Sequence, residues 1–165
     1  MLIIQDTREK EGKKEHILKV FRRYGYTIVR EKIDVGDYMF SHENKITVDV
    51  KENMLEVVSN LTKQHERFKR ELIRANENNK KLFILVEEPL KSIYSVQFWK
   101  SPIYKFGKLK GKPITNINPH TLMKMMITIQ NKYNCEFVFC KKEETGKKIL
   151  ELLRKENDYG RENDS

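Results

Sequence analysis

ITVDVK, residues 46–51, is the stretch that decides the fold of this chain, because apolar and polar side chains alternate along it. Alternation with a period of two is typical of a β-strand that turns one face to the core. Val48 and Val50 therefore point to one side of the strand, and Asp49 and Lys51 share the other side. The strand places two charged groups next to each other, at its carboxyl end.

Strand and helix patterns alternate along the rest of the chain. The segments 38–41 and 46–50 are predicted to pair as a hairpin. Residues 82–86 form a continuous apolar run, which suits a strand covered by helices on both faces. The other predicted strands are 2–6, 27–29 and 135–140, and the predicted helices are 13–24, a stretch from 54 to about 75, 119–134 and 143–155. This order predicts an α/β fold, with a mixed β-sheet flanked by helices in a single domain. Within the second helical stretch, His65 falls on the apolar face and is expected to line the core.

Positive charge is concentrated in one part of the chain. The net charge is +9, and the segment 88–134, with eight lysines and a single acid, carries +7 of it. The irregular part of this segment also holds Tyr94, Phe98, Trp99, Tyr104 and Phe106. A run of lysines alone is often just a solvated surface, but aromatic side chains among lysines can stack on bases. The segment therefore favours contact with nucleic acid.

The length of 165 residues suits one domain of ordinary size. We expect the domain to span residues 1–157, with 88–118 as an irregular basic and aromatic loop or insertion. The remaining residues, 158–165, are expected to form a polar tail.

No feature of the sequence points to a membrane or to an oxidising compartment. Cys135 and Cys140 lie on one predicted strand and point to opposite faces, so we expect both to be reduced and buried. No apolar run approaches the ~18 residues of a membrane span. Charged residues between positions 6 and 10 interrupt any apolar leader. We expect a cytoplasmic protein, in the host cytoplasm if it is encoded by a phage.

Three charged residues lie near the ends of the predicted hairpin strands. Asp37 follows Gly36 at the start of one strand, and Asp49 and Lys51 share one face of the other. Two carboxylates offer the hard oxygen ligands that Mg²⁺ prefers, and they leave room on the ion for water and a phosphate oxygen. Such a metal acidifies water and stabilises charge on phosphate, and a lysine can orient that water. The alternative is a strand-end salt bridge, and spacing alone does not separate the two.

Four motifs occur in the order and spacing of a known family. They are DTRE (6–9), VGDY (35–38), VDVK (48–51), and a helix with Arg67-Phe68 and Glu71 that leads to an apolar strand ending in Glu87. Over about residues 2–87 the chain resembles the XPF-type structure-specific endonuclease domain, which belongs to the restriction-endonuclease-like, or PD-(D/E)xK, superfamily. The segment 118–153 resembles the C-terminal part of small phage-type members.

The resemblance implies a restriction-endonuclease-like fold and a metal-dependent DNA endonuclease. The enzyme would act at branched, flap or junction DNA, in phage or bacterial DNA repair or recombination. Mg²⁺ or Mn²⁺ would be the cofactor and DNA the partner, and family analogy favours a homodimer. Water activated by the metal would attack a phosphodiester in line and leave a 5′-phosphate and a 3′-hydroxyl.

The resemblance also assigns roles by position. The residues assigned to catalysis are Asp37, Asp49, Lys51, Asp6 and Glu9, of which Asp37, Asp49 and Asp6 would bind the metal. Arg8 and Arg67 would hold phosphates or orient the acids. Local caps and salt bridges are the alternative roles of Asp6, Glu9, Arg8 and Arg67. From the charge pattern we add the candidate DNA-binding lysines Lys100, Lys105, Lys108, Lys110 and Lys112.

The chain departs from the family pattern in three ways. The family's Glu-Arg-Lys triplet is DVK at 49–51, so the middle arginine is lost. The family's acid four residues after the lysine falls on Leu55, and Glu52 and Glu56 are the out-of-register candidates to replace it. No helix-hairpin-helix tandem follows, which leaves 91–112 as the candidate for DNA contact. Two other functions stay open: a non-catalytic nucleic-acid-binding module on the same fold, and a phage interaction protein.

Overall fold

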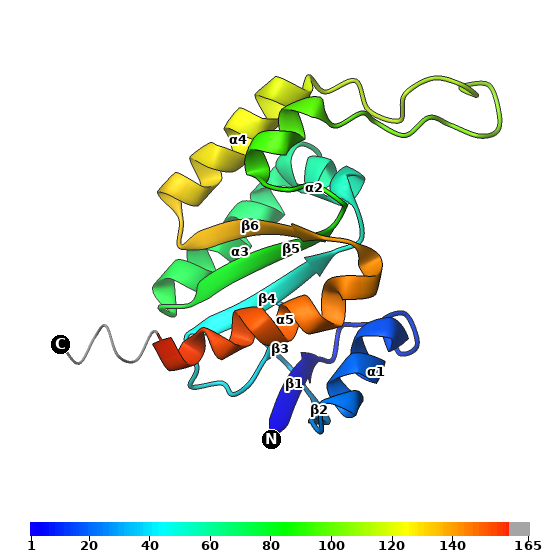
Figure 1. Cartoon of the computed structure of the whole chain (residues 1–165). Coiled ribbons are helices and arrows are strands. Elements are labelled where there is room, and N and C mark those ends of the chain that lie inside the picture. Colours follow the sequence, from blue (N-terminus) through cyan, green and yellow to red (C-terminus); the bar gives the residue numbers. More distant parts are fainter. Residues whose placement is uncertain (159–165) are drawn as a thin grey trace.

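The structure is a computed structural model that describes residues 1–158. A six-stranded mixed sheet forms its centre, with the strand order β2-β1-β3-β4-β5-β6 (Figure 1). Residues 159–165, most of the predicted polar tail, lie outside the described residues. The elements are β1 (Leu2–Asp6), α1 (Glu15–Arg23), β2 (Thr27–Glu31), β3 (Tyr38–Met39), β4 (Ile46–Lys51), α2 (Met54–Leu61), α3 (His65–Glu77), β5 (Lys81–Glu87), the 3₁₀ helix η1 (Ile93–Phe98), α4 (Pro119–Lys132), β6 (Cys135–Cys140), the 3₁₀ helix η2 (Lys142–Glu144) and α5 (Thr145–Arg154). Strand β3 runs antiparallel to β1 and β4, and the other pairs are parallel. The predicted mixed α/β sheet is confirmed.

Helices cover both faces of the sheet (Figure 1). Helices α1 and α5 pack against one face, where Val48 and Val50 join their apolar core. Helices α2, α3 and α4 cover the other face, over a second core that includes Ile84. Because side chains alternate along β4, Asp49 and Lys51 are turned toward the α2–α3 side. The sheet thus separates the charged side chains of β4 from its valines, as the alternation predicted.

The predicted hairpin forms, but its first strand is shorter than expected. Tyr38 pairs with Val48 in antiparallel register, and β3 ends at Met39 rather than at residue 41. The next residue, Phe40, stacks on the ring of Tyr26 with the ring centroids 5.8 Å apart. The chain leaves the sheet at this point, and the ring of Phe40 packs on Tyr26 instead of extending β3.

The predicted helical stretch after residue 53 is two helices, because the chain turns between Leu61 and His65. Asn53 caps α2 by accepting a hydrogen bond from the N–H of Glu56 at 3.0 Å. Helix α3 begins a new helical phase at His65, whose imidazole is exposed beside Glu66. The prediction that His65 lines the core is therefore wrong.

The segment between β5 and α4 is mostly irregular. It contains η1 and an isolated antiparallel bridge between Ile103 and Pro113. Asn118 caps α4 by accepting a hydrogen bond from the N–H of Thr121, with Pro119 at the first helical position. No helix within residues 1–158 combines the length and the apolar character that crossing a membrane requires.

Gly36, directly before Asp37, occupies a position that suits only glycine. Its φ of +83° lies in the left-handed region, and an added Cβ would collide with the hydroxyl of Thr47. That hydroxyl donates a hydrogen bond to the carbonyl oxygen of Val35 at 2.7 Å. We predict that Gly36→Ala lowers the free energy of unfolding by about 2–4 kcal/mol, from backbone strain and the displaced hydroxyl. Urea unfolding measures this loss.

Gly12→Ala is the matched control for this substitution. Gly12 has nearly the same φ, +84°, but nothing lies within 4 Å of an added Cβ. Only the backbone strain applies there, and we expect a loss of about 1–2 kcal/mol. Equal losses in the two variants would contradict the role given to the contact with Thr47.

Candidate active site

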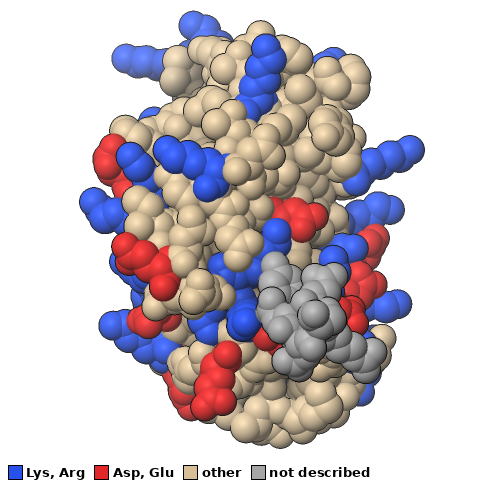
Figure 2. Space-filling model, turned by 90° about the vertical axis from the view of Figure 1, so that its left-hand side faces the viewer, with Lys and Arg blue, Asp and Glu red and all other residues tan. Residues whose placement is uncertain are grey.

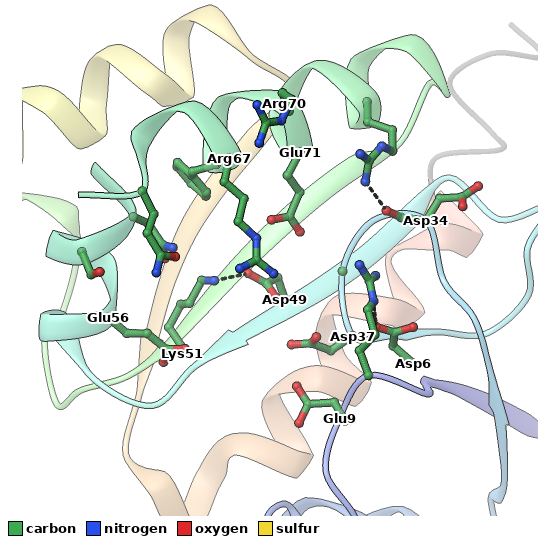
Figure 3. Close-up of a pocket in the computed structure, with 17 residues that line it drawn as sticks. Asp6, Glu9, Asp34, Asp37, Asp49, Lys51, Glu56, Arg67, Arg70 and Glu71 are labelled. Atoms are coloured by element: carbon green, nitrogen blue, oxygen red, sulfur yellow. Dashed lines mark hydrogen bonds and ion pairs between the residues drawn. The ribbon is translucent and has the colours of Figure 1, made fainter. Parts of the chain in front are cut away.

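A polar pocket of about 570 Å³ lies between the carboxyl end of β4, the loops next to β1 and β3, and helices α2 and α3 (Figure 3). Its charged lining residues are Asp6, Arg8, Glu9, Asp34, Asp37, Asp49, Lys51, Glu56, Arg67, Arg70, Glu71 and Arg74. The structure therefore brings together all the predicted catalytic residues and both predicted arginines, from segments far apart in the sequence.

Asp49 and Lys51 form an ion pair in this pocket, with Nζ of the lysine 2.9 Å from Oδ2 of the aspartate. Both side chains are buried, with only 9% of Asp49 and 11% of Lys51 exposed. Oδ2 of Asp49 is fully buried against this ammonium group, and a carboxylate oxygen has a second lone pair for a further partner. The strand-end salt bridge is thus present, and it lies inside the pocket.

Lys51 is held as a cation in this setting. Burial lowers the pKa of its ammonium group, but the charge and hydrogen bond of Asp49 outweigh burial and raise that pKa above its usual value. The charges of Glu71 and Asp37 act in the same direction. Lys51 can therefore donate hydrogen bonds and stabilise negative charge, but it does not accept a proton at neutral pH.

Asp37 is fixed next to Asp49 by the pairing of β3 with β4. Its N–H donates to the carbonyl oxygen of Val48 at 2.8 Å, and its Oδ2 accepts from the N–H of Val50 at 2.8 Å. Burial raises the pKa of Asp37 well above its usual value, and the charges of Asp49 and Glu9 raise it further. Carboxylates that disfavour one another's charge in this way favour a bound cation.

The raised pKa of Asp37 predicts that the stability of the metal-free protein falls as pH rises. The folded protein holds this proton more tightly than the unfolded chain, whose pKa is about 3.8. The stabilisation is therefore complete below that pH and is lost as pH rises through the folded-state pKa. Asparagine does not titrate, so Asp37→Asn should gain unfolding free energy relative to wild type as pH rises. Urea unfolding in EDTA across a pH series measures the difference, and a difference independent of pH would contradict the prediction.

Asp6 and Arg8 are tied into the wall of the pocket. Oδ1 of Asp6 accepts from the N–H of Ile33 at 3.0 Å, and Oδ2 accepts from Nε of Arg8 at 2.6 Å. Arg8 also donates to the carbonyl oxygen of Ile33 at 2.6 Å. Each oxygen of Asp6 therefore accepts one hydrogen bond from the wall of the pocket.

Helix α3 adds a residue that the position-by-position assignment left out of the site. Glu71 points from α3 into the pocket, beside the side chain of Arg67, as Figure 3 shows. Burial raises the pKa of Glu71, and the negative charge of Asp49 raises it further, so Glu71 lies close enough to Asp49 to be repelled by its charge. Arg67, Glu71 and Arg74 follow helical spacing along one side of α3. That spacing was visible in the sequence, but it did not show that this side of the helix faces β4.

Neither candidate for the acid missing at Leu55 supplies a free carboxylate to Asp37 and Asp49. Glu56 lines the pocket, but its Oε2 accepts from the N–H of Glu52 at 2.7 Å, at the start of α2. Oε1 of Glu52 lies 3.8 Å from Nζ of Lys14, and Glu52 does not line the pocket. Glu71 is the additional acid that the structure brings to the site.

The donor set fits a hard divalent cation. Proteins commonly hold Mg²⁺ with one or two carboxylates plus water and substrate phosphate. Asp37 and Asp49 supply two carboxylates that lie next to each other in the pocket. Among residues 1–158 there is no cluster of three or more His, Cys, Asp or Glu side chains already arranged around a metal position. The pocket therefore offers a partial set of ligands that substrate and water would complete.

The predicted DNA-binding lysines are not part of this pocket. They lie on the segment between η1 and α4 and are Lys100, Lys105, Lys108, Lys110 and Lys112. If they contact nucleic acid, the contact is separate from the acidic pocket.

Comparisons with known proteins agree with this architecture. A family model described as the ERCC4 domain matches residues 5–153. A structure of XPF from Aeropyrum pernix superimposes with a TM-score of 0.63 over 93% of this chain, at 18% identity. A structure of XPF from Aeropyrum pernix in complex with DNA also gives a TM-score of 0.63, over 95% of this chain at 19% identity. This chain spans 60% and 65% of those two chains. The comparison with curated proteins found no match. The predicted resemblance to XPF-type domains and the predicted fold class are confirmed.

Proposed function

This chain belongs to the ERCC4 domain family, and on that premise we propose that it is a divalent-metal-dependent DNA endonuclease. The observation that carries the proposal is the placement of Asp37, Asp49 and Lys51 in one pocket. Two carboxylates that disfavour one another's charge lie beside a buried ammonium group. Such a pair favours a bound cation, and the ammonium group suits a reaction in which negative charge grows on phosphate.

Each of the three side chains has a distinct task. Asp37 and Asp49 would hold Mg²⁺ or Mn²⁺, which supplies Lewis acidity to a phosphate oxygen and acidifies a bound water. Lys51 donates hydrogen bonds to the attacking water or to the phosphate, since its raised pKa keeps the proton on Nζ. In-line attack on the phosphodiester would leave a 5′-phosphate and a 3′-hydroxyl.

The surrounding residues support these three. We assign Asp6 and Arg8 to positioning, because their mutual contact fixes the loop next to Asp37. Glu9 adds negative charge next to Asp37. Arg67 lines the pocket and is exposed, so it can bind a phosphate of the substrate.

The family resemblance suggests which DNA structure is the substrate and in which process the enzyme acts. The proposed substrate is branched, flap or junction DNA, and the proposed setting is DNA repair or recombination in a phage or a bacterium, within the cytoplasm. The DNA-bound structure of XPF from Aeropyrum pernix supports DNA as the partner class. A homodimer is proposed on the same family ground.

A cleavage assay tests the proposed function. The protein is incubated with single-stranded, duplex, flap, fork and junction DNA of one sequence, with Mg²⁺, with Mn²⁺ or with EDTA. We expect cleavage with metal and none with EDTA, strongest on a branched substrate. Metal-independent binding without cleavage would favour the non-catalytic binding module. The absence of any DNA affinity would favour an interaction protein, and either result would overturn the proposal.

A further inference from the structure

Residues 100–116, called the arm from here on, form a hairpin-like extension that stands away from the body (Figure 1). Its two sides are joined by backbone hydrogen bonds from the N–H of Tyr104 to the carbonyl oxygen of Lys112 and from the N–H of Gly111 to that of Tyr104, both at 2.9 Å. Nearer the base, the N–H of Ile114 donates to the carbonyl oxygen of Pro102 at 2.8 Å. These cross-links give the arm a defined shape without a sheet or helix to support it.

The arm exposes apolar side chains that a folded chain usually covers. Phe106, near its tip, is 85% exposed. The other large apolar residues exposed on the arm are Ile103, Leu109 and Ile114. By contrast, Trp99 at the base is buried. Exposed apolar side chains gathered on one extension are typical of a binding surface.

The arm is also purely basic. It carries Lys100, Lys105, Lys108, Lys110 and Lys112 and no acid. Among residues 1–158 none of these lysines forms an ion pair. Figure 2 shows the side of the molecule opposite the arm, where Lys and Arg side chains also project but Asp and Glu side chains lie among them. The arm differs from that surface in its lack of compensating acids.

We propose that the arm binds an unpaired single strand of DNA, with a base stacked on Phe106 and phosphates held by the lysines around it. This inference rests on the proposed function and names the part of a branched substrate that the arm would recognise. Stacking requires a base that is not covered by its neighbours, so a flat exposed ring among lysines suits a single strand. A regular duplex would engage the lysines through its phosphates and leave Phe106 in water.

The position of the arm is compatible with binding the strand that enters the pocket. Strands β4 and β5 are parallel, with Lys51 paired to Val86, so their carboxyl ends lie at the same edge of the sheet. The pocket lies at this end of β4, and the chain continues from this end of β5 through η1 into the arm. The chain therefore leaves the sheet toward the arm at the same edge at which the pocket lies.

A binding experiment without metal tests the arm separately from catalysis. The probe is a single-stranded oligonucleotide containing 2-aminopurine, compared with the same sequence as a blunt duplex, both in EDTA. We expect the wild-type protein to prefer the single strand and to change the 2-aminopurine fluorescence. Phe106→Ala should weaken single-strand binding roughly tenfold to hundredfold, with little change for the duplex. Phe106→Trp should retain the fluorescence change, because a larger ring still stacks.

Two kinds of control accompany these variants. Tyr24→Ala removes another exposed aromatic ring, 48% exposed at the end of α1, and should leave binding unchanged. Lys108→Gln and Lys110→Gln should each reduce the slope of log affinity against log salt by about 0.7 if the lysine contacts a phosphate of a single strand. Neither lysine contacts the folded body through an ion pair, so the variants should fold normally.

Several results would overturn the inference. One is equal single-strand affinity for wild type and Phe106→Ala, and another is an equal loss for single strand and duplex. A third is binding of the arm to anionic lipid vesicles without affinity for the single strand. If wild type cleaves DNA with Mg²⁺ but Phe106→Ala binds normally, the arm inference fails and the nuclease proposal stands. If Phe106→Ala loses single-strand binding but wild type never cleaves, the nuclease proposal fails and the arm inference stands.

Discussion

Asp37→Asn is expected to reduce metal-dependent DNA cleavage by about 10³-fold or more while the protein stays folded. Asparagine keeps an oxygen that can accept the hydrogen bond from the N–H of Val50, so the β3–β4 pairing survives. It removes one of the two negative charges that favour a cation in the pocket. A metal contributes several kcal/mol of transition-state stabilisation, which corresponds to this loss of rate. Single-turnover cleavage with Mg²⁺ measures the effect.

A change of acid to amide outside the pocket is the matched control. Glu43→Gln alters an exposed residue in the turn of the same hairpin, and we expect the wild-type cleavage rate from it. DNA binding in EDTA should persist in Asp37→Asn, since the substitution reduces negative charge near the DNA. Cleavage by Asp37→Asn at the wild-type rate would refute the assignment of Asp37.

Lys51→Ala is expected to lower the cleavage rate by about 10²–10⁴-fold, the range associated with losing a positioned donor or an electrostatic stabiliser. The pKa of Lys51 is raised by Asp49, so the substitution removes a cation that is paired directly with Asp49. Single-turnover rates at several pH values measure the effect. Because Lys51 does not act as a base, raising the pH through the neutral range should not narrow the gap in rate between Lys51→Ala and wild type.

The removal of Lys51 also leaves Asp49 buried without its ion-pair partner, so loss of fold must be separated from loss of chemistry. Lys51→Met keeps most of the side-chain volume without the charge, and its thermal unfolding reports on the fold. Lys45→Ala, at an exposed position just before β4, is the control for removing a lysine near this strand. A folded Lys51→Met variant that cleaves like wild type would show that the ammonium group has no catalytic task.

The strands and helices were largely predictable, because each carries its own local pattern. Alternation marked β4, the apolar run marked β5, and the Asn118-Pro119 pair marked the start of α4. The errors arose where a contact from elsewhere in the chain decided the outcome. Phe40 leaves the sheet to stack on Tyr26, and the turn after α2 takes His65 out of the apolar face.

The sequence by itself determined which charged residues share a face, since alternation along β4 places Asp49 beside Lys51 whatever surrounds them. Only the tertiary structure decided what these residues meet. In the folded protein Glu71 of α3 lies in the pocket, and both oxygens of Asp6 accept hydrogen bonds from neighbouring residues. The arm does not line the pocket. The physical reason is that spacing acts over a few residues, whereas burial and charge depend on segments that meet only when the sheet and its helices pack together.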